Sequence, residues 1–292
     1  MNMNTLKTMF FLTILTLLFV FIGNMAGGQS GAIIALLLAG IMNFVSYWFS
    51  DKIVLKMYRA KEIQYNDHPK YYNLVQQLAN NAGLPMPRLY IIPSETPNAF
   101  ATGRDPQHAA VAATEGILAR LSEDELAGVM AHELGHVKNR DILISSVVAT
   151  FAGAIGYIAS MAQWAAIFGG FNRGSDDEDS GSSNIVSFIL LAVLAPIIAT
   201  MIQLAISRSR EFLADRTGAE ISRKPLQLAN ALIKLEKDNH QLPLQANNAT
   251  AHMFIISPLR GGGMANLFRT HPTTEERIAK LKQFAQETGL IS

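Results

Sequence analysis

The pentapeptide His132-Glu133-Leu134-Gly135-His136 sets two histidines four residues apart. On an α-helix, four residues advance about 400°, so both imidazoles lie on one face and can reach one zinc ion. Glu133 projects roughly 100° around the helix, beside the metal rather than onto it. The segment is therefore predicted to be a helix that carries part of a metal centre.

This residue pattern indicates hydrolytic chemistry. A zinc ion held by two neutral imidazoles and one carboxylate keeps a fourth position for water and lowers the pKa of that water. Glu133, off the metal, suits a general base that takes the proton as the water attacks a carbonyl. The reaction indicated is peptide hydrolysis without a covalent intermediate. The alternative is a surface helix with two solvated histidines.

The helix itself has clear local signals. Ser122 followed by Glu125 is a capping box, and apolar residues at helical spacing follow it. These apolar residues are Leu126, Val129 and Met130.

A third metal ligand must come from elsewhere in the chain. The longer zinc-peptidase motif with a third histidine is absent, because Asn139 and Ile142 stand where its glycine and histidine would fall. Glu211 is the best candidate, since it begins a helical stretch and has Asp215 one turn later on its own face. Asp215 could accept the remaining N–H of a zinc-bound histidine and so fix its tautomer. Alternatively, both carboxylates only pair with Arg208, Arg210 or Arg216.

The composition predicts a membrane protein. The chain is 49% hydrophobic and only 16% charged, which is too apolar for a purely soluble protein of 292 residues. Four long runs have at most one charged residue each and are candidate transmembrane helices. They are Leu6–Ile22, Gly31–Phe49, Ile142–Gly170 and Ile185–Ile206, with a polar turn over Gly23–Ser30. For the last two, a buried helical pair in a soluble core is the alternative.

The charged flanks of these runs predict the orientation in the membrane. Lysines and arginines follow the second and fourth runs and precede the third, so those flanks, both termini and the metal motif are expected in the cytoplasm. The acidic loop 171–184 is expected on the other side. The absence of cysteine agrees with a reducing compartment, and the net charge of +1 gives no indication of nucleic-acid binding.

The expected fold is an α/β, zincin-like catalytic domain, mainly helical with a small sheet, integrated with four candidate transmembrane helices. A helix is expected at 69–82 and strand-like stretches at 88–92, 99–102 and 108–114. Further helices are expected over 226–235 and after Thr273. The expected parts are a hairpin at 1–50, peptidase domain at 51–141, a second hairpin at 142–206 and the rest of the peptidase domain at 207–292.

Several motifs together resemble the HtpX-type membrane metallopeptidases, relatives of the CAAX prenyl proteases. They are Thr96–Gly103, His132–His136, Asn139–Asp141, Glu211–Asp215 and His271-Pro272, beside the apolar hairpins. The resemblance implies an endopeptidase of the bacterial inner membrane, with one zinc ion per chain, that acts in quality control on membrane or unfolded proteins. It also implies that His132, His136 and Glu211 bind zinc and that Glu133 is the base.

The resemblance implies two further roles. The stretch Asn98, Ala99, Phe100 and Ala101 resembles an edge strand that binds the substrate backbone as an added strand. The alternative there is a loop tightened by Pro97 and Gly103. His271 resembles a residue that hydrogen-bonds the tetrahedral oxyanion, although before Pro272 it could equally be a helix-entry residue.

Other function classes remain open from the residues alone. A membrane scaffold with a structural zinc would need the ligands but has no use for Glu133. A peptidase for prenylated C-termini fits less well, because that relative has more spans, and a transporter fits poorly because the apolar runs are almost bare of charge. If the helices run on continuously, both halves of the metal centre lie within about 10 Å of the bilayer.

Overall fold

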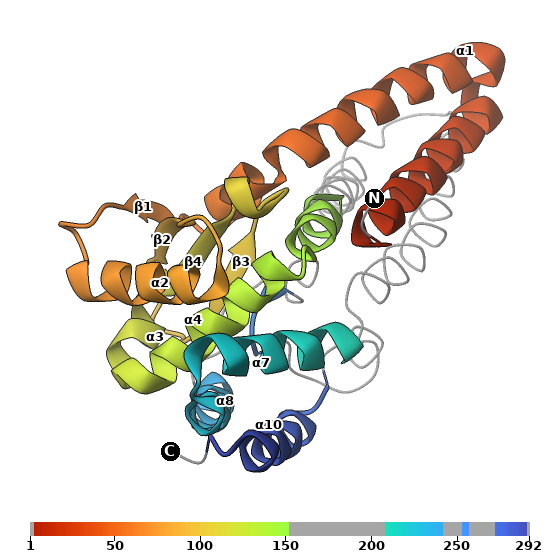
Figure 1. Ribbon diagram of the computed structural model, residues 1–292. Coiled ribbons are helices and arrows are strands. Elements are labelled where there is room, and N and C mark those ends of the chain that lie inside the picture. Colours follow the sequence, from red (N-terminus) through yellow and green to blue (C-terminus); the bar gives the residue numbers. More distant parts are fainter. Residues whose placement is uncertain (1–2, 152–207, 242–252, 257–271, 291–292) are drawn as a thin grey trace.

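The computed structural model describes residues 3–151, 208–241, 253–256 and 272–290. Within them, helices surround a small four-stranded sheet, and one long helical hairpin projects away from this body (Figure 1). Mainly helical architecture with a small sheet is what the sequence predicts. The sheet and the helices against it hold the candidate metal centre.

The projecting hairpin is α1 (Met3–Met57), which bends back on itself at two glycines. Gly27 and Gly28 leave helical geometry, and the φ of +58° at Gly28 lies in the left-handed region that favours glycine. The predicted turn over Gly23–Ser30 is therefore too wide, because the helix continues on either side of this glycine pair. Across the hairpin, Asn43 Nδ2 donates to Thr16 Oγ1 at 2.8 Å.

One helix of the described residues is long and apolar enough to cross a membrane, namely the arm Gly27–Met57. Apolar side chains along this arm are exposed, as in a helix that faces lipid. The first arm has a shorter apolar helix at Thr8–Phe21, and Ile142–Phe151 is likewise short. The prediction of four spans is thus supported for one. The fourth run, the rest of the third and the acidic loop 171–184 lie outside the described residues.

The strands form one sheet in the order β1-β2-β4-β3. The strands β2 and β4 are parallel, whereas β1 and β3 are antiparallel to their neighbours and lie at the two edges. Their bounds are β1 Lys61–Ile63, β2 Arg88–Ile92, β3 Ala99–Thr102 and β4 Ala110–Thr114. The predicted strands at 88–92 and 99–102 are confirmed. The third begins only at Ala110, because η1 (Pro106–His108) precedes it. The strand β1 was not predicted.

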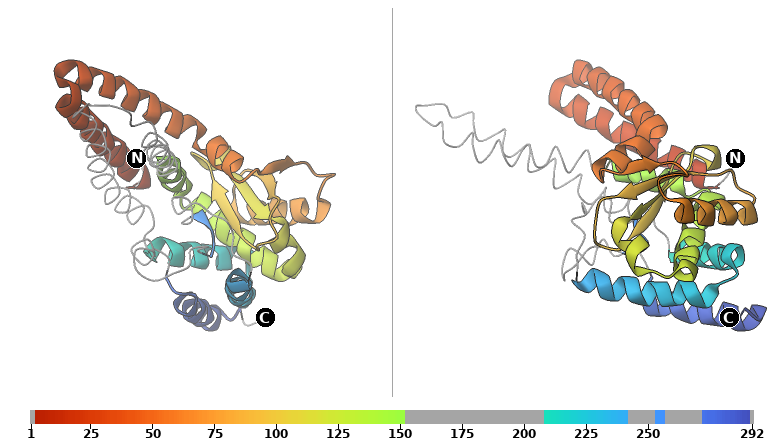
Figure 2. Two further views of the ribbon diagram at one scale, coloured as in Figure 1. Left: turned by 180° about the vertical axis from the view of Figure 1, so that it is seen from behind. Right: turned by 90° about the vertical axis from the view of Figure 1, so that its left-hand side faces the viewer.

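Both faces of the sheet are covered. Successive side chains along a strand point to opposite faces, so they enter two different hydrophobic cores. In β4, Val111 and Ala113 pack with the helices, while Ala110 and Ala112 pack beside Val54 at the end of α1. This explains why β4 is apolar at nearly every position. It also anchors the membrane-length arm directly on the body that contains the sheet (Figures 1 and 2).

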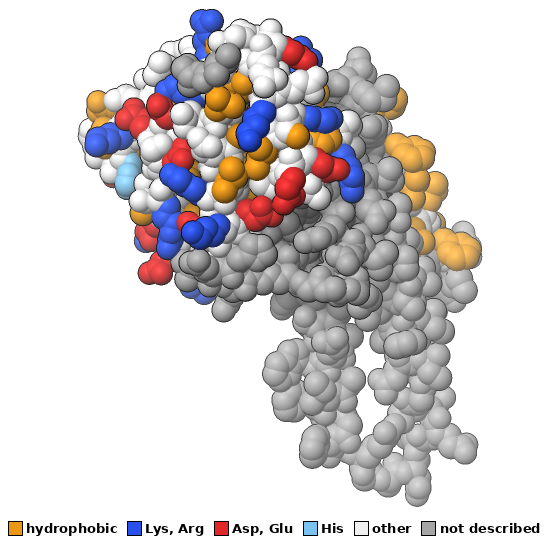
Figure 3. All heavy atoms as spheres, turned by 90° about the horizontal axis from the view of Figure 1, so that it is seen from below, with side chains coloured by type: hydrophobic (Ala, Val, Ile, Leu, Met, Phe, Trp, Pro, Cys, Tyr) orange, Lys and Arg blue, Asp and Glu red, His pale blue; other side chains and the backbone are white. Residues whose placement is uncertain are grey.

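The helices on the other side of the sheet come from both halves of the chain and share one hydrophobic core with it (Figure 2). They are α2 (Pro69–Ala82), α3 (Glu115–Arg120), α4 (Glu123–Lys138), α7 (Arg208–Ser222), α8 (Pro225–Gln241) and α10 (Thr274–Thr288). The helices predicted at 69–82, at 226–235 and after Thr273 are confirmed; α3 was not predicted. Seen from below, acidic and basic side chains are intermingled over the surface of the C-terminal helices, as on a face in contact with water (Figure 3).

Candidate metal centre

The helix α4 carries the two histidines, and its start is fixed as predicted. Ser122 Oγ accepts from the Glu125 N–H at 3.3 Å, while Glu125 Oε2 accepts from the Ser122 N–H at 2.9 Å. The helix ends at Lys138, and Arg140 takes a left-handed φ of +58° before the next helical segment. A continuous helix from His136 into the apolar run is therefore wrong, and the distance to the bilayer estimated from it does not hold for this half.

The helix α7 brings Glu211 to α4 because glycines let the two helices approach closely. A Cβ atom on Gly218 would lie 2.7 Å from the backbone nitrogen of His132, and one on Gly135 would lie 2.9 Å from the carbonyl oxygen of Ala214. Both distances are too short for any side chain. The small residues thus place the first turn of α7, with Glu211, over the histidines.

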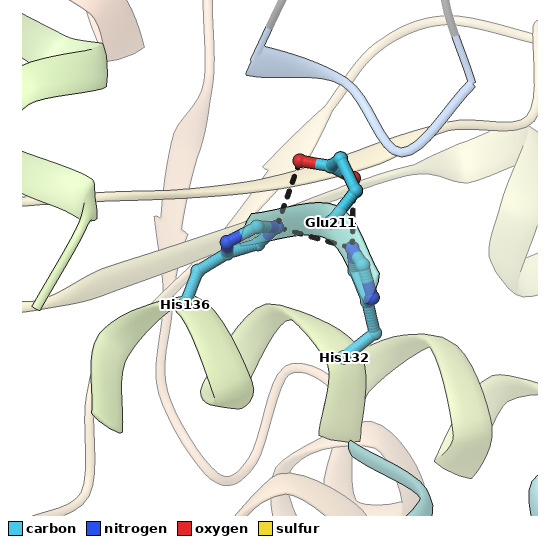
Figure 4. A group of neighbouring side chains, drawn as sticks. All are labelled: His132, His136 and Glu211. Atoms are coloured by element: carbon cyan, nitrogen blue, oxygen red, sulfur yellow. Dashed lines mark hydrogen bonds and ion pairs between the residues drawn. The ribbon is translucent and has the colours of Figure 1, made fainter. Parts of the chain in front are cut away.

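Three side chains converge at this crossing (Figure 4). The Nε2 atoms of His132 and His136 are 3.1 Å apart, and the Glu211 carboxylate oxygens lie 3.7 Å from the first and 3.6 Å from the second. Tetrahedral ligands at usual zinc bond lengths lie about 3.4 Å from one another. The donor set of two imidazoles and one carboxylate, at this spacing, fits a zinc ion.

Each histidine has a carboxylate on its other ring nitrogen. Asp215 Oδ1 lies 2.9 Å from His132 Nδ1, and Asp141 Oδ2 lies 3.2 Å from His136 Nδ1. A carboxylate there accepts from Nδ1–H, which leaves the lone pair of Nε2 for a metal. Asp215 thus lies where the sequence argument expected it. Asp141 ends the motif Asn139–Asp141 but was given no role of its own, although its place in the turn just after the helix could have indicated one.

Arg277 on α10 was not singled out from the sequence. It is 1% exposed and donates to Asp215 from Nε at 2.8 Å and from Nη2 at 2.6 Å. The sequence signal was a charged residue on the same helical face as Leu281 and Ala285, which are both buried. Arg277 therefore holds the carboxylate that orients His132.

The electrostatic surroundings give the two histidines different pKa values. Burial lowers the pKa of His132, whereas Asp141 and Glu211 outweigh the burial of His136 and raise its pKa to about 10. Burial alone would raise the pKa of Asp215, but Arg277 holds it at about 2. Without a metal, one histidine is thus neutral and the other cationic near pH 7.

Glu133 lies beside the three ligands and is 1% exposed. Burial, followed by the nearby Glu211 carboxylate, raises the pKa of Glu133 to about 7. The backbone N–H of Ala101 on β3 lies near enough to the Glu133 carboxylate to lower this pKa in part. The strand β3 and the helix α4 therefore meet at this side chain.

The predicted substrate-binding stretch lies in β3 and just before it, at an edge of the sheet. Its outer edge contacts another part of the chain, because Ile255 N–H donates to the Ala99 carbonyl at 3.2 Å and Asn98 Nδ2 donates to the Ile256 carbonyl at 2.9 Å. Phe100 points to the opposite core, against Phe254. The alternative of a tightened loop is wrong, since residues 99–102 are a strand.

Of the remaining histidines considered, His271 lies outside the described residues. His108 is half exposed and pairs with Asp105 at 2.7 Å, as expected for an ordinary surface residue. Within the described ranges, His132, His136 and Glu211 are the group of metal-binding side chains that converge.

A His-Glu-x-x-His helix, completed by a glutamate from a second helix, defines the metal-dependent peptidases of the zincin type. The chain matches peptidase family M48 over residues 66–285, which includes all of these residues. It therefore belongs to peptidase family M48.

Relatives of similar length match this chain over nearly its whole sequence. A protease HtpX homolog from Syntrophotalea carbinolica is 57% identical over 96% of this chain and 98% of its own. One from Persephonella marina is 55% identical over 99% of this chain and 100% of its own. The crystal structure of Ste24p from S. mikatae has the same fold at 18% identity, with a TM-score of 0.54 over 95% of this chain and 64% of that one.

Proposed function

We propose that this protein is an integral-membrane zinc endopeptidase that hydrolyses peptide bonds of membrane-associated or misfolded proteins. The observation that carries this proposal is the convergence of His132, His136 and Glu211 with a buried carboxylate, Glu133, beside them. Membership of peptidase family M48 and the protease names of its relatives support the same reaction class.

In the proposed mechanism, His132, His136 and Glu211 hold one zinc ion. When bound, zinc supplies Lewis acidity that polarises the scissile carbonyl and lowers the pKa of water. Glu133 accepts the proton of the attacking water and later gives it to the departing amine. Its burial helps, because a carboxylate out of bulk water has a pKa nearer neutrality and can both take and release a proton.

Asp215 and Asp141 are positioning residues in this proposal. Each accepts the Nδ1–H of one histidine and so keeps the Nε2 lone pair directed at the metal. Arg277 keeps Asp215 ionised and in place. A purely structural zinc site would need these groups but not Glu133.

We propose that substrates bind as an added strand along Asn98, Ala99, Phe100 and Ala101. The position of β3 at a sheet edge and its contact with Glu133 support this arrangement. The Ala99 carbonyl already accepts from Ile255, so a substrate that pairs there must replace this bond. Peptides N-methylated at one amide at a time test the proposal. We expect KM to rise at alternate positions, because strand amides alternate in direction. Equal KM values throughout would exclude an added strand.

His271 is proposed to hydrogen-bond the oxyanion, on the basis of its motif alone. The variant His271→Ala should keep its zinc and lose turnover by about a hundredfold or more. Normal turnover would remove His271 from the mechanism.

We propose a multi-pass protein of the bacterial inner membrane, with four spans and with both termini and the peptidase domain in the cytoplasm. The membrane-length arm and its exposed apolar side chains support membrane insertion.

Reconstituted protein provides the test of the proposed zinc-dependent reaction: chelation should abolish cleavage of a membrane-tethered substrate, and zinc should restore it. Cleavage that survives complete metal removal would contradict the proposed function.

A further inference from the structure

The membrane-length arm of α1 ends in an aromatic cluster followed by charge. Trp48 lies twenty positions beyond Gly28, which at a rise of 1.5 Å per residue is about 30 Å, the thickness of a hydrocarbon core. Trp48 and Phe49 are about two-fifths exposed, and Asp51 and Lys52 follow them. This pattern is typical of a helix that leaves the bilayer at the headgroup level.

A cavity of about 710 Å³ lies at this same level, between α1 and the segment around η1. Its apolar part includes Phe44 and Trp48 from the arm, and its polar part includes Lys52, Arg88 and Arg104. The volume is in the range of small-molecule sites. An apolar wall on the membrane side and cations on the body side are thus combined in one cavity.

The cations of the cavity differ in how much of their charge is already compensated. Arg88 pairs with Asp51 and so ties α1 to β2. Arg104 approaches Asp105 through Nε at 3.5 Å and lies 4.6 Å from the Trp48 ring centroid. Among the described residues, Lys52 has no carboxylate partner, and its ammonium lies 5.4 Å from the Phe49 ring centroid. Lys52 and the terminal nitrogens of Arg104 remain for an anion.

We propose that this cavity binds the headgroup of an anionic phospholipid, with Lys52 and Arg104 contacting its phosphate. Arginine and lysine are the usual phosphate ligands, and basic residues at the membrane surface attract anionic lipids. The aromatic wall favours a lipid over a soluble phosphate, because Phe44 lies one turn deeper along the arm, at the level of the acyl chains. The site is separate from the metal centre, and its occupancy does not depend on peptide cleavage.

The test uses Trp48 as the reporter in the full-length protein. The chain has two tryptophans, so a Trp164→Phe background leaves Trp48 alone. The protein is placed in phosphatidylcholine nanodiscs with increasing fractions of brominated phosphatidylglycerol, and quenching of Trp48 is measured. Saturation at a low fraction is expected, because a site fills before the surrounding lipid does.

The variant Lys52→Gln/Arg104→Gln should need about a 25-fold higher fraction for half-saturation, since each cation near the surface contributes about fivefold. The matched control Lys56→Gln/Lys70→Gln removes two exposed cations that do not line the cavity and should bind like the wild type. If folding of the double variant fails, the exposed single variant Lys52→Gln should still show about a fivefold loss.

Two outcomes would overturn the proposal. One is an equal loss in the control variant, which would show only general surface attraction. The other is displacement of the brominated lipid by free glycerol phosphate at equal concentration, which would show recognition of a soluble phosphate. Retention of binding by Lys52→Arg/Arg104→Lys would support a requirement for charge at these positions.

Discussion

Arg277 donates two hydrogen bonds to Asp215, and Asp215 Oδ1 lies 2.9 Å from Nδ1 of His132. These three residues come from α10, α7 and α4, so one buried chain of charge-assisted contacts joins three helices at the metal centre. Because the guanidinium is rigid and bidentate, it fixes the plane of the carboxylate and thereby the orientation of the imidazole.

The first prediction concerns Arg277→Gln. We expect the metal affinity to fall about 10- to 100-fold, as when an outer partner of a metal ligand is removed, and the free energy of unfolding to fall by about 3 to 5 kcal/mol. Competition with a chelator measures the first quantity and denaturant unfolding the second. The control is Arg216→Gln on α7, whose exposed pair with Glu220 contributes little. Unchanged metal affinity in Arg277→Gln would contradict the positioning role.

The second prediction concerns protons. Because Asp141 and Glu211 raise the pKa of His136 to about 10 while the pKa of His132 is lowered, His136 in the metal-free centre is cationic at pH 8 and carries an additional proton on Nε2. Zinc must displace it, so binding should release about one proton, and affinity should rise about tenfold per pH unit up to about pH 10. Calorimetry in buffers of different ionisation enthalpy measures the release. Asp141→Asn should reduce it, and binding without proton release would show that His136 is already neutral.

The third prediction concerns the crossing of α4 and α7. A methyl group at Gly218 would lie 2.7 Å from a backbone nitrogen of α4, which cannot move aside alone. Gly218→Ala should therefore push the helices apart, destabilise the fold by about 1 to 3 kcal/mol and weaken metal binding. Gly40→Ala is the control, because nothing lies within 4 Å of a Cβ there. Equal stability and metal content in both variants would mean that the crossing tolerates a wider separation.

Local spacing predicted α4 and its cap because these depend on residues within one or two turns. Glu211 was a candidate ligand because it begins a helical stretch with Asp215 one turn later, and the motif resemblance supported it. Its distance from the histidines was not predictable, since helix order along the chain does not determine which helices cross. The roles of Arg277 and Asp141 were not predicted for the same reason: they depend on partners 62 and five residues away, across a helix packing or a turn. The contact of Ile255 with the β3 edge likewise has no local signal.

The apolar runs were less informative about the membrane. Hydropathy depends only on composition. It therefore indicated the apolar arm Gly27–Met57, but it could not show that the turn of the hairpin consists of one pair of glycines. In Ile142–Phe151 the apolar side chains are buried, unlike those of α1, and composition does not distinguish the two situations.

Glu133→Gln tests the central claim most directly, because it removes the base and leaves the three metal-binding side chains in place. Wild type and variant, reconstituted in proteoliposomes, are compared for metal content and for cleavage of a fluorogenic membrane-tethered peptide. We predict one zinc ion per chain in both and a loss of kcat by at least 100-fold in the variant alone. If both bind zinc and cleave equally, or if both bind zinc and neither cleaves any of a broad panel of peptides, the proposed peptidase mechanism is wrong.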